Sequence, residues 1–339
     1  MNLFKTFFAV TLLVASMLCT SVFAQSEVAD SAGIADAIET EKQTVYYEIK
    51  LTITGRGKAS KITATSPFPL EWPEQTIEIV KKTKSDPVRN ISFKPLTKLA
   101  KQMVIKINRL SDGEVAEAAV VVKTERSLVR KPDDTAGYKY AKKLPGPVKQ
   151  FLRPSPYIES GKKDLKEIAT GIPIDKELPA WQQVEEIYKW VREKLEYKFD
   201  PAIHTCLQAI ENGHGDCEEL SSLFIAVCRA RGIPARAVWV SADRVGGVTH
   251  TYPEFYLEDA GGKGHWLPCQ AAGDYQFGEM TDSRLILQKG DRFKLPGHSK
   301  PLRYVQPTCI GDAPQGLGFE WSVRVLSDEE VPGPRPNSN

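Results

Sequence analysis

The apolar residues of this chain change their spacing along its length, and few folds accommodate both spacings. From Val45 to Ile53 they alternate with polar residues, which is the period of a half-buried β-strand. After Pro179 they recur every three or four residues, as on one face of a helix that begins behind a proline. We therefore expect a β-rich first part followed by a part that mixes helices with strands, an α+β organisation.

The β-rich part extends well beyond its first strand. Short runs of strand-forming residues follow, separated by Pro and Gly, at 62–65, 76–80, 91–93, 103–107 and 118–124. This punctuation is typical of a β-sandwich, which we expect over residues 45–127. The region contains neither His nor Cys, so we expect no catalytic residue there.

The remaining chain divides by composition and periodicity. Residues 128–177 are expected to form a connector rich in Lys, Pro and Gly, with a short helix at 164–170. Residues 178–310 are expected to form an α+β core, and 311–339 a C-terminal strand and tail. The helical stripe after Pro179, which includes Trp181 and Tyr188, is interpreted as core packing.

The N-terminus predicts export. Lys5 precedes a short apolar run, and small residues follow the run just before Gln25. This is the pattern of a cleavable signal peptide over residues 1–24. Residues 25–44 are expected to be a flexible leader. No second apolar stretch of about 18 residues follows, so we expect no membrane span after cleavage and a secreted or periplasmic location.

The charge composition excludes one class of partner. Lys and Arg number 45 against 43 Asp and Glu, giving a net charge of +2 without a block of like charges. A nucleic-acid-binding surface requires a basic patch, so no nucleic-acid partner is expected.

A candidate nucleophile lies in the segment GHGDCEEL at 213–220. The apolar residues from Leu220 to Val227 follow helical spacing, and Gly232 with Pro234 supplies a stop. Cys217 is thus expected at a helix N-terminus, where free N–H groups and the helix dipole favour thiolate. We predict a free, nucleophilic Cys217 that alkylates at mildly acidic pH.

A thiol nucleophile requires a base and a residue that orients the base. His250 opens an apolar strand at 250–257, and a second strand at 265–270 is expected to pair with it antiparallel. His250 is therefore the candidate base, and Gln270, at the end of the second strand, the candidate orienting residue.

With these residues the segment from about Leu178 to Gly290 resembles the transglutaminase-like superfamily of papain-like thiol enzymes. The resemblance rests on four motifs: GDCE at 215–218, RARGIPAR at 229–236, HTYPEFYL at 250–257 and GHWLP at 264–268. It implies a papain-like core with the nucleophile helix on an antiparallel sheet. It also implies a Cys, His, Asp triad with Cys217 as nucleophile and His250 as base.

The chain departs from the family pattern at the third triad position, where it has Gln270 instead of aspartate. A neutral amide can accept the imidazole N–H but does not stabilise imidazolium by charge. Asp274 is the alternative orienting residue.

Two functions are therefore expected as alternatives. The first is cysteine-dependent amide acyl transfer through a thioester, as peptide hydrolysis or glutamine transamidation, on a protein or peptide substrate. The second is a catalytically inactive module that binds peptide or protein.

The cysteines allow further hypotheses. Signal cleavage leaves five, an odd number, and we predict that Cys269 pairs with Cys309, leaving Cys206 or Cys228 unbridged. A zinc site of His204, Cys206, His214 and Cys217 is an alternative, but its spacing matches no common zinc pattern. Neither a metal nor a cofactor is expected.

Overall fold

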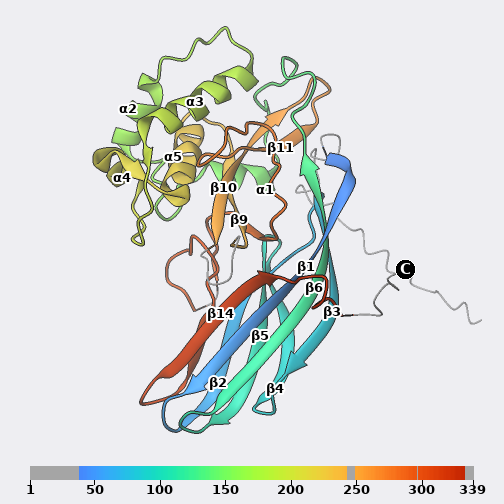
Figure 1. Ribbon diagram of the computed structural model, residues 1–339. Helices are drawn as coiled ribbons and strands as arrows, with labels where there is room; N and C mark the ends of the chain where they lie inside the picture. Colours follow the sequence, from blue (N-terminus) through green and yellow to red (C-terminus); the bar gives the residue numbers. More distant parts are fainter. Residues whose placement is uncertain (1–37, 243–248, 296, 333–339) are drawn as a thin grey trace, which may run out of the picture.

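The computed structural model describes residues 38–242, 249–295 and 297–332. A β-sandwich forms one end of the molecule and an α+β unit the other (Figure 1). The predicted signal peptide at 1–24 lies outside the described residues, and so does most of the predicted leader. None of the described helices is long and apolar enough to cross a membrane.

The sandwich consists of two four-stranded antiparallel sheets, with strand orders β14-β1-β6-β3 and β13-β2-β5-β4. The strands are β1 (Ile38–Gly55), β2 (Ala59–Phe68), β3 (Gln75–Lys84), β4 (Val88–Thr97), β5 (Ala100–Leu110), β6 (Val115–Val129), β13 (Thr308–Asp312) and β14 (Leu317–Val325). Each predicted β-rich run lies within one of these strands. The alternation that predicted the first strand is confirmed, because Ile49, Leu51 and Ile53 are fully buried between the sheets.

Both ends of the chain build the sandwich, which corrects three predicted boundaries. β1 begins at Ile38, so residues 38–44 belong to a strand and not to a flexible leader. β13 and β14 complete the two sheets, so the sandwich extends beyond 45–127 and the core ends before 310. The physical reason is pairing: without β14 and β13, β1 and β2 would each leave an unpaired edge.

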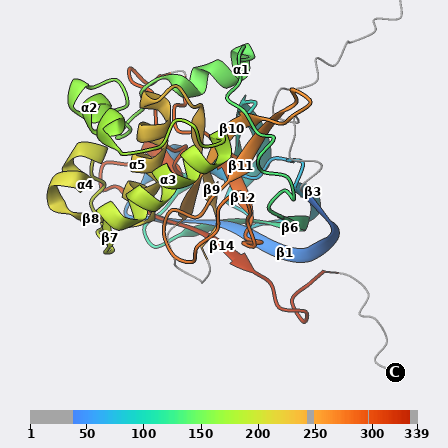
Figure 2. The ribbon, with the colours of Figure 1, turned by 90° about the horizontal axis from the view of Figure 1, so that it is seen from above.

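The α+β unit places helices against a sheet of order β11-β10-β9-β12, seen from above in Figure 2. Its sheet strands are β9 (Ala235–Val240), β10 (His250–Glu258), β11 (Gly264–Pro268) and β12 (Ile286–Lys289). Its helices are α1 (Gly146–Lys149), the 3₁₀ turn η1 (Gln150–Leu152), α2 (Lys163–Gly171), α3 (Ala180–Lys194), α4 (Cys206–Asn212) and α5 (Cys217–Ala230), and a short parallel pair joins β7 (Glu196–Tyr197) to β8 (His214–Gly215).

The helix predicted behind Pro179 is confirmed as α3, with Trp181 and Tyr188 buried in the core. The short helix predicted at 164–170 lies within α2. The predicted connector, however, is part of the core, because Ile158, Leu165 and Ala169 are buried in the same apolar cluster as α5.

Buried polar groups join the two units. Lys289 of β12 contacts Glu74 of the sandwich and Glu254 of β10, both at 2.6 Å. Arg126 of β6 donates to the backbone carbonyls of Glu74 and Asp282 at 3.3 Å. The Lys289 ion pairs and the bond from Arg126 to Asp282 fix the sandwich against the sheet that carries His250.

Candidate active site

Cys217 is the first residue of α5, as predicted, and a capping box fixes this helix start. The Asp216 side chain accepts from the Glu218 N–H at 2.7 Å, and Glu219 accepts from the Asp216 N–H at 3.0 Å. Gly215 leaves room for the Glu219 side chain, since a Cβ at Gly215 would lie 2.4 Å from the Cβ of Glu219. The helix cap itself therefore requires a glycine two residues before Cys217.

His250 is the first residue of β10, and its ring contacts Gln270. The distance from His250 Nε2 to Gln270 Oε1 is 3.0 Å. An amide oxygen only accepts, so Nε2 carries the proton and Nδ1 presents a lone pair that can take one. Asp274, the alternative orienting residue, is solvent-exposed.

Helix α3 holds the loop that carries Gln270. The Tyr188 hydroxyl donates to the Gln270 carbonyl at 2.8 Å, and Arg192 donates to the same carbonyl at 3.0 Å. Arg192 also donates to Gly273 O at 2.6 Å. The sequence analysis assigned Tyr188 to the core alone and did not single out Arg192. No local sequence pattern indicates that α3 contacts a loop so distant in the chain.

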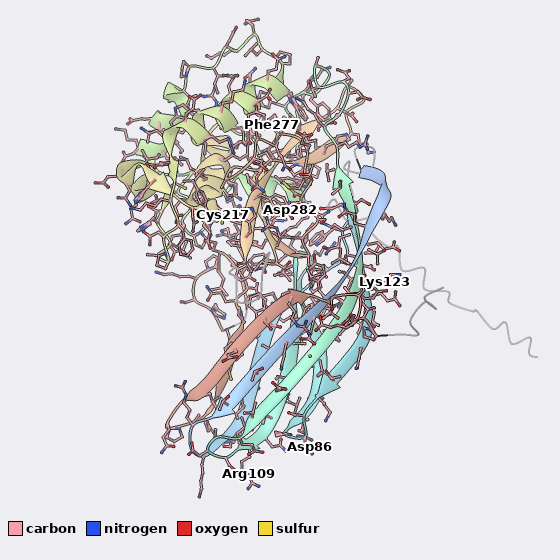
Figure 3. The ribbon with its side chains drawn as sticks, in the orientation of Figure 1. Asp86, Arg109, Lys123, Cys217, Phe277 and Asp282 are labelled. Atoms are coloured by element: carbon pink, nitrogen blue, oxygen red, sulfur yellow. The ribbon has the colours of Figure 1, made fainter. Side chains whose placement is uncertain are left out.

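The nucleophile helix contacts the strand of the base. Ser221 Oγ, one turn after Cys217, donates to Thr251 O at 3.2 Å. The backbone of Thr251 also lowers the pKa of the Cys217 thiol, which places it near the sulfur. The sulfur therefore lies beside the residue that follows His250, and Cys217 is found where the α+β unit meets the sandwich (Figure 3).

The electrostatic surroundings of Cys217 differ from the expectation. Burial, together with the charge of Asp216, raises the pKa of the Cys217 thiol to about 12, against the lowering effect of the Thr251 backbone. The pKa of Asp216 is itself raised by burial and by the neighbouring Glu219. The acidic residues that cap the helix thus offset its dipole, so the predicted ready alkylation at mildly acidic pH is opposed by this environment.

Asp282 is a further carboxylate near the base, which sequence reasoning missed. It precedes β12, and Arg284 Nε donates to its two carboxylate oxygens at 2.9 and 2.7 Å. Burial alone would raise the pKa of Asp282, yet Arg284 holds it below its usual value, and the charge of His250 acts in the same direction. Figure 3 labels Asp282 at the same junction as Cys217.

Two cavities adjoin the site. The smaller, of about 410 Å³, is lined by His250, Leu220, Tyr197 and the loop 271–273. The larger, of about 870 Å³, runs between the α+β unit and the sandwich and reaches Glu218 and Thr249. Because these are the neighbours of Cys217 and His250, space for a substrate extends from the site in two directions.

The predicted pairing of Cys269 with Cys309 is wrong, since all five described cysteines are free. Cys269 is buried in the core of the α+β unit, whereas Cys309 lies on β13 against the sandwich core. The zinc alternative fails too: Cys206 donates to Tyr157 O at 3.0 Å and His204 contacts Asp200 at 3.1 Å. Within the described ranges, no three candidate metal ligands come together.

Comparisons with known proteins agree with this geometry. Residues 166–271 match the model of the transglutaminase-like superfamily. No curated protein sequence gives a significant match.

Solved structures add the fold. A Cytophaga hutchinsonii protein named "putative cysteine protease" is similar with a TM-score of 0.56 at 16% identity, covering 85% of this chain and 92% of that one. The periplasmic domain of TgpA from Pseudomonas aeruginosa is similar with a TM-score of 0.30 at 12% identity, covering 70% and 92%. Residues 166–271 of this chain therefore carry a transglutaminase-like domain, which lies in an α+β unit joined to a β-sandwich.

Proposed function

We propose that this protein is a cysteine-dependent acyl-transfer enzyme that attacks the amide carbonyl of a protein or peptide substrate. The observation that carries the proposal is the 3.0 Å contact between His250 Nε2 and Gln270 Oε1 on the strand beside Cys217. This contact favours the imidazole tautomer that a base needs, with the proton on Nε2 and Nδ1 as the atom that accepts a proton.

The first step is proton transfer from the thiol. His250 Nδ1 takes the proton of Cys217 Sγ as sulfur attacks the carbonyl carbon, and the resulting imidazolium returns it to the leaving nitrogen when the C–N bond breaks. Burial and the nearby carboxylates favour a neutral thiol at rest. Proton transfer therefore accompanies attack and does not precede it as a stable ion pair.

The oxyanion of the tetrahedral intermediate requires a donor. Asp216 already accepts from the N–H groups of Glu218 and Glu219 through the capping box, and its carbonyl accepts from Leu220. Among the described residues this leaves the backbone N–H of Cys217 itself as the first-turn donor for the oxyanion. Water or an amine then resolves the thioester, giving hydrolysis or transamidation.

The first test is turnover. Wild type and Cys217→Ala are incubated with a glutamine-containing peptide and a fluorescent primary amine, and cleavage, ammonia release and amine incorporation are measured by mass spectrometry. Wild type should turn over and Cys217→Ala should not. Cys309→Ala, which removes a half-buried thiol from the sandwich, is the matched control and should keep full activity.

The alternative is an inactive module that keeps the cavities for binding, and the neutral partner of His250 favours it. Native protein treated with iodoacetamide separates the two functions. Modification of Cys217 that is lost in His250→Ala supports the enzyme. A Cys217 that stays unmodified, together with no turnover, would reject it.

The proposed location is outside the cytoplasm. The charged start, apolar run and small-residue close of residues 1–24 support a cleavable signal peptide. N-terminal sequencing of the protein isolated from its native host tests this, and a mature chain that begins at Gln25 is the expected result.

A further inference from the structure

Cationic side chains outnumber carboxylates in the lining of the larger cavity. Lys94 and Arg303 line it, against one carboxylate, that of Glu218. Arg303 already engages this carboxylate, with Nε 3.2 Å from Glu218 Oε2. Among the described lining residues, the unmatched charge is therefore cationic.

Arg303 lies at the first turn of the nucleophile helix. Its Nη2 donates to Glu218 O at 3.1 Å, and its guanidinium lies 5.3 Å from the ring centre of Trp239. The side chain is only 5% exposed, yet Nη1 has no hydrogen-bond partner within the described structure. A buried guanidinium with unused N–H groups is a site for an anion, because planar carboxylates match its geometry.

The sandwich supplies the opposite wall. Thr65, Lys94 and Gln102 line the cavity from strands β2, β4 and β5. Lys94 pairs in register with Gln102, so both side chains lie on the same face of the sheet. Lys94 is exposed and forms no ion pair with any described residue, so its charge is available to a ligand.

We infer that this cavity is a subsite for a substrate carboxylate, the side chain of an Asp or Glu near the amide that Cys217 attacks. The inference rests on the proposed function for the position of that amide. Arg303 bonds the backbone of the residue next to Cys217, so the bound carboxylate lies close along the peptide to the reacting carbonyl. Substrate selection is then shared with the sandwich through Lys94.

Binding to Cys217→Ser protein tests the subsite without any chemistry. The probes are two fluorescein-labelled peptides, one with two glutamates beside a central glutamine and one with glutamines in their place. Fluorescence anisotropy should give about tenfold tighter binding of the acidic peptide, with a difference that shrinks as salt rises.

Variants locate the effect. Lys94→Met should weaken binding of the acidic peptide by about threefold to fivefold and leave binding of the neutral peptide unchanged. Lys106→Met is the matched control, an exposed lysine on the same face of the same sheet that does not line the cavity, and should change neither. Arg303→Met should abolish the preference, and Arg303→Lys should keep part of it.

Two results would overturn the inference: equal affinity for the two peptides, or equal losses from Lys94→Met and Lys106→Met. Because Lys94 is exposed, its variant keeps the test decisive even if Arg303→Met does not fold. Failure of the proposed function is seen separately, as an unreactive Cys217 in the wild-type protein.

Discussion

Gln270 gives His250 a neutral partner, and the residues around Cys217 are consistent with it. An amide oxygen fixes the imidazole tautomer without stabilising imidazolium by charge. Burial and Asp216 meanwhile raise the pKa of the thiol. Both effects favour a protonated Cys217 thiol at rest.

The substitution Gln270→Glu tests the effect of this neutral partner, because glutamate has the shape of glutamine and adds a negative charge. The new carboxylate should raise the pKa of His250 and stabilise thiolate. We expect alkylation of Cys217 by iodoacetamide at pH 6 to rise about tenfold, the order of one charged hydrogen bond. Gln270→Ala should lower it, and an unchanged rate in both variants would contradict the orienting role.

The raised pKa of Cys217 has a direct consequence for its pH profile. A thiol whose pKa is raised stays protonated at pH 7, where an ordinary cysteine near 8.5 is already a few per cent thiolate. Cys217 should therefore alkylate more slowly in native protein than in urea-unfolded protein at pH 7, and its native rate should keep rising above pH 9. A plateau of fast native alkylation below pH 6 would refute the raised pKa.

At the scale of the elements, α3 connects the core to the active-site loop. Its apolar stripe packs inward, while Tyr188 and Arg192 hold the carbonyls of Gln270 and Gly273. Without these donors the loop would depend on local turns alone, and a small displacement of Gln270 would release His250. Arg192 is thus a positioning residue.

We expect Arg192→Ala to lower kcat by about tenfold to a hundredfold with a smaller change in KM, because it misplaces the base and not the substrate. Lys189→Ala is the control on the same helix, since it removes only an exposed contact with Glu186. Peptide turnover and circular dichroism measure activity and folding. A loss of activity that follows loss of folding would point to a structural role instead.

At the scale of the whole molecule, the sandwich and the α+β unit share buried charges. Lys289 contacts Glu74 on one side and Glu254 on the other, and all three side chains are at most 2% exposed. Burial alone would raise the pKa of Glu254, but Lys289 and Arg236 hold it below its usual value. Buried ion pairs therefore hold the sandwich against the sheet that carries His250.

Removing the buried cation Lys289 should lower the free energy of unfolding far more than removing a surface lysine. We expect Lys289→Met to lower the free energy of unfolding by about 3–5 kcal/mol, because Glu74 then stays buried without its cation and Glu254 keeps only Arg236. Lys42→Met, which loses an exposed contact with Glu125, should cost less than about 1 kcal/mol. Urea unfolding measures both.

The pH dependence gives a second check on Lys289→Met. The ionised Glu254 stabilises the wild type above the usual carboxyl pKa, and this stabilisation is lost as pH falls through its lowered folded value. The difference in the free energy of unfolding between wild type and Lys289→Met should therefore decrease as the pH is lowered. A difference that stays constant down to pH 3 would show that the ion pairs do not cause it.

The sequence by itself determined the local structure and named the residues of the candidate site. Alternation of apolar residues predicted the strand that contains Ile49 and Ile53, and helical spacing predicted α3 and α5. The helical spacing from Leu220 to Val227 predicted Cys217 at a helix start, and the structure places Gln270 beside His250. The strand and the helices follow from short-range periodicity, which neighbouring residues fix.

Only the tertiary structure decided which distant segments meet. β13 and β14 complete a sandwich that begins at Ile38, Arg192 reaches the loop of Gln270, and Arg303 reaches the first turn of α5. The burial that raises the pKa of Cys217 and separates Cys269 from Cys309 also depends on packing between units. Such contacts join residues far apart in the chain, and their energies come from desolvation and pairing in the folded state, which no local pattern encodes.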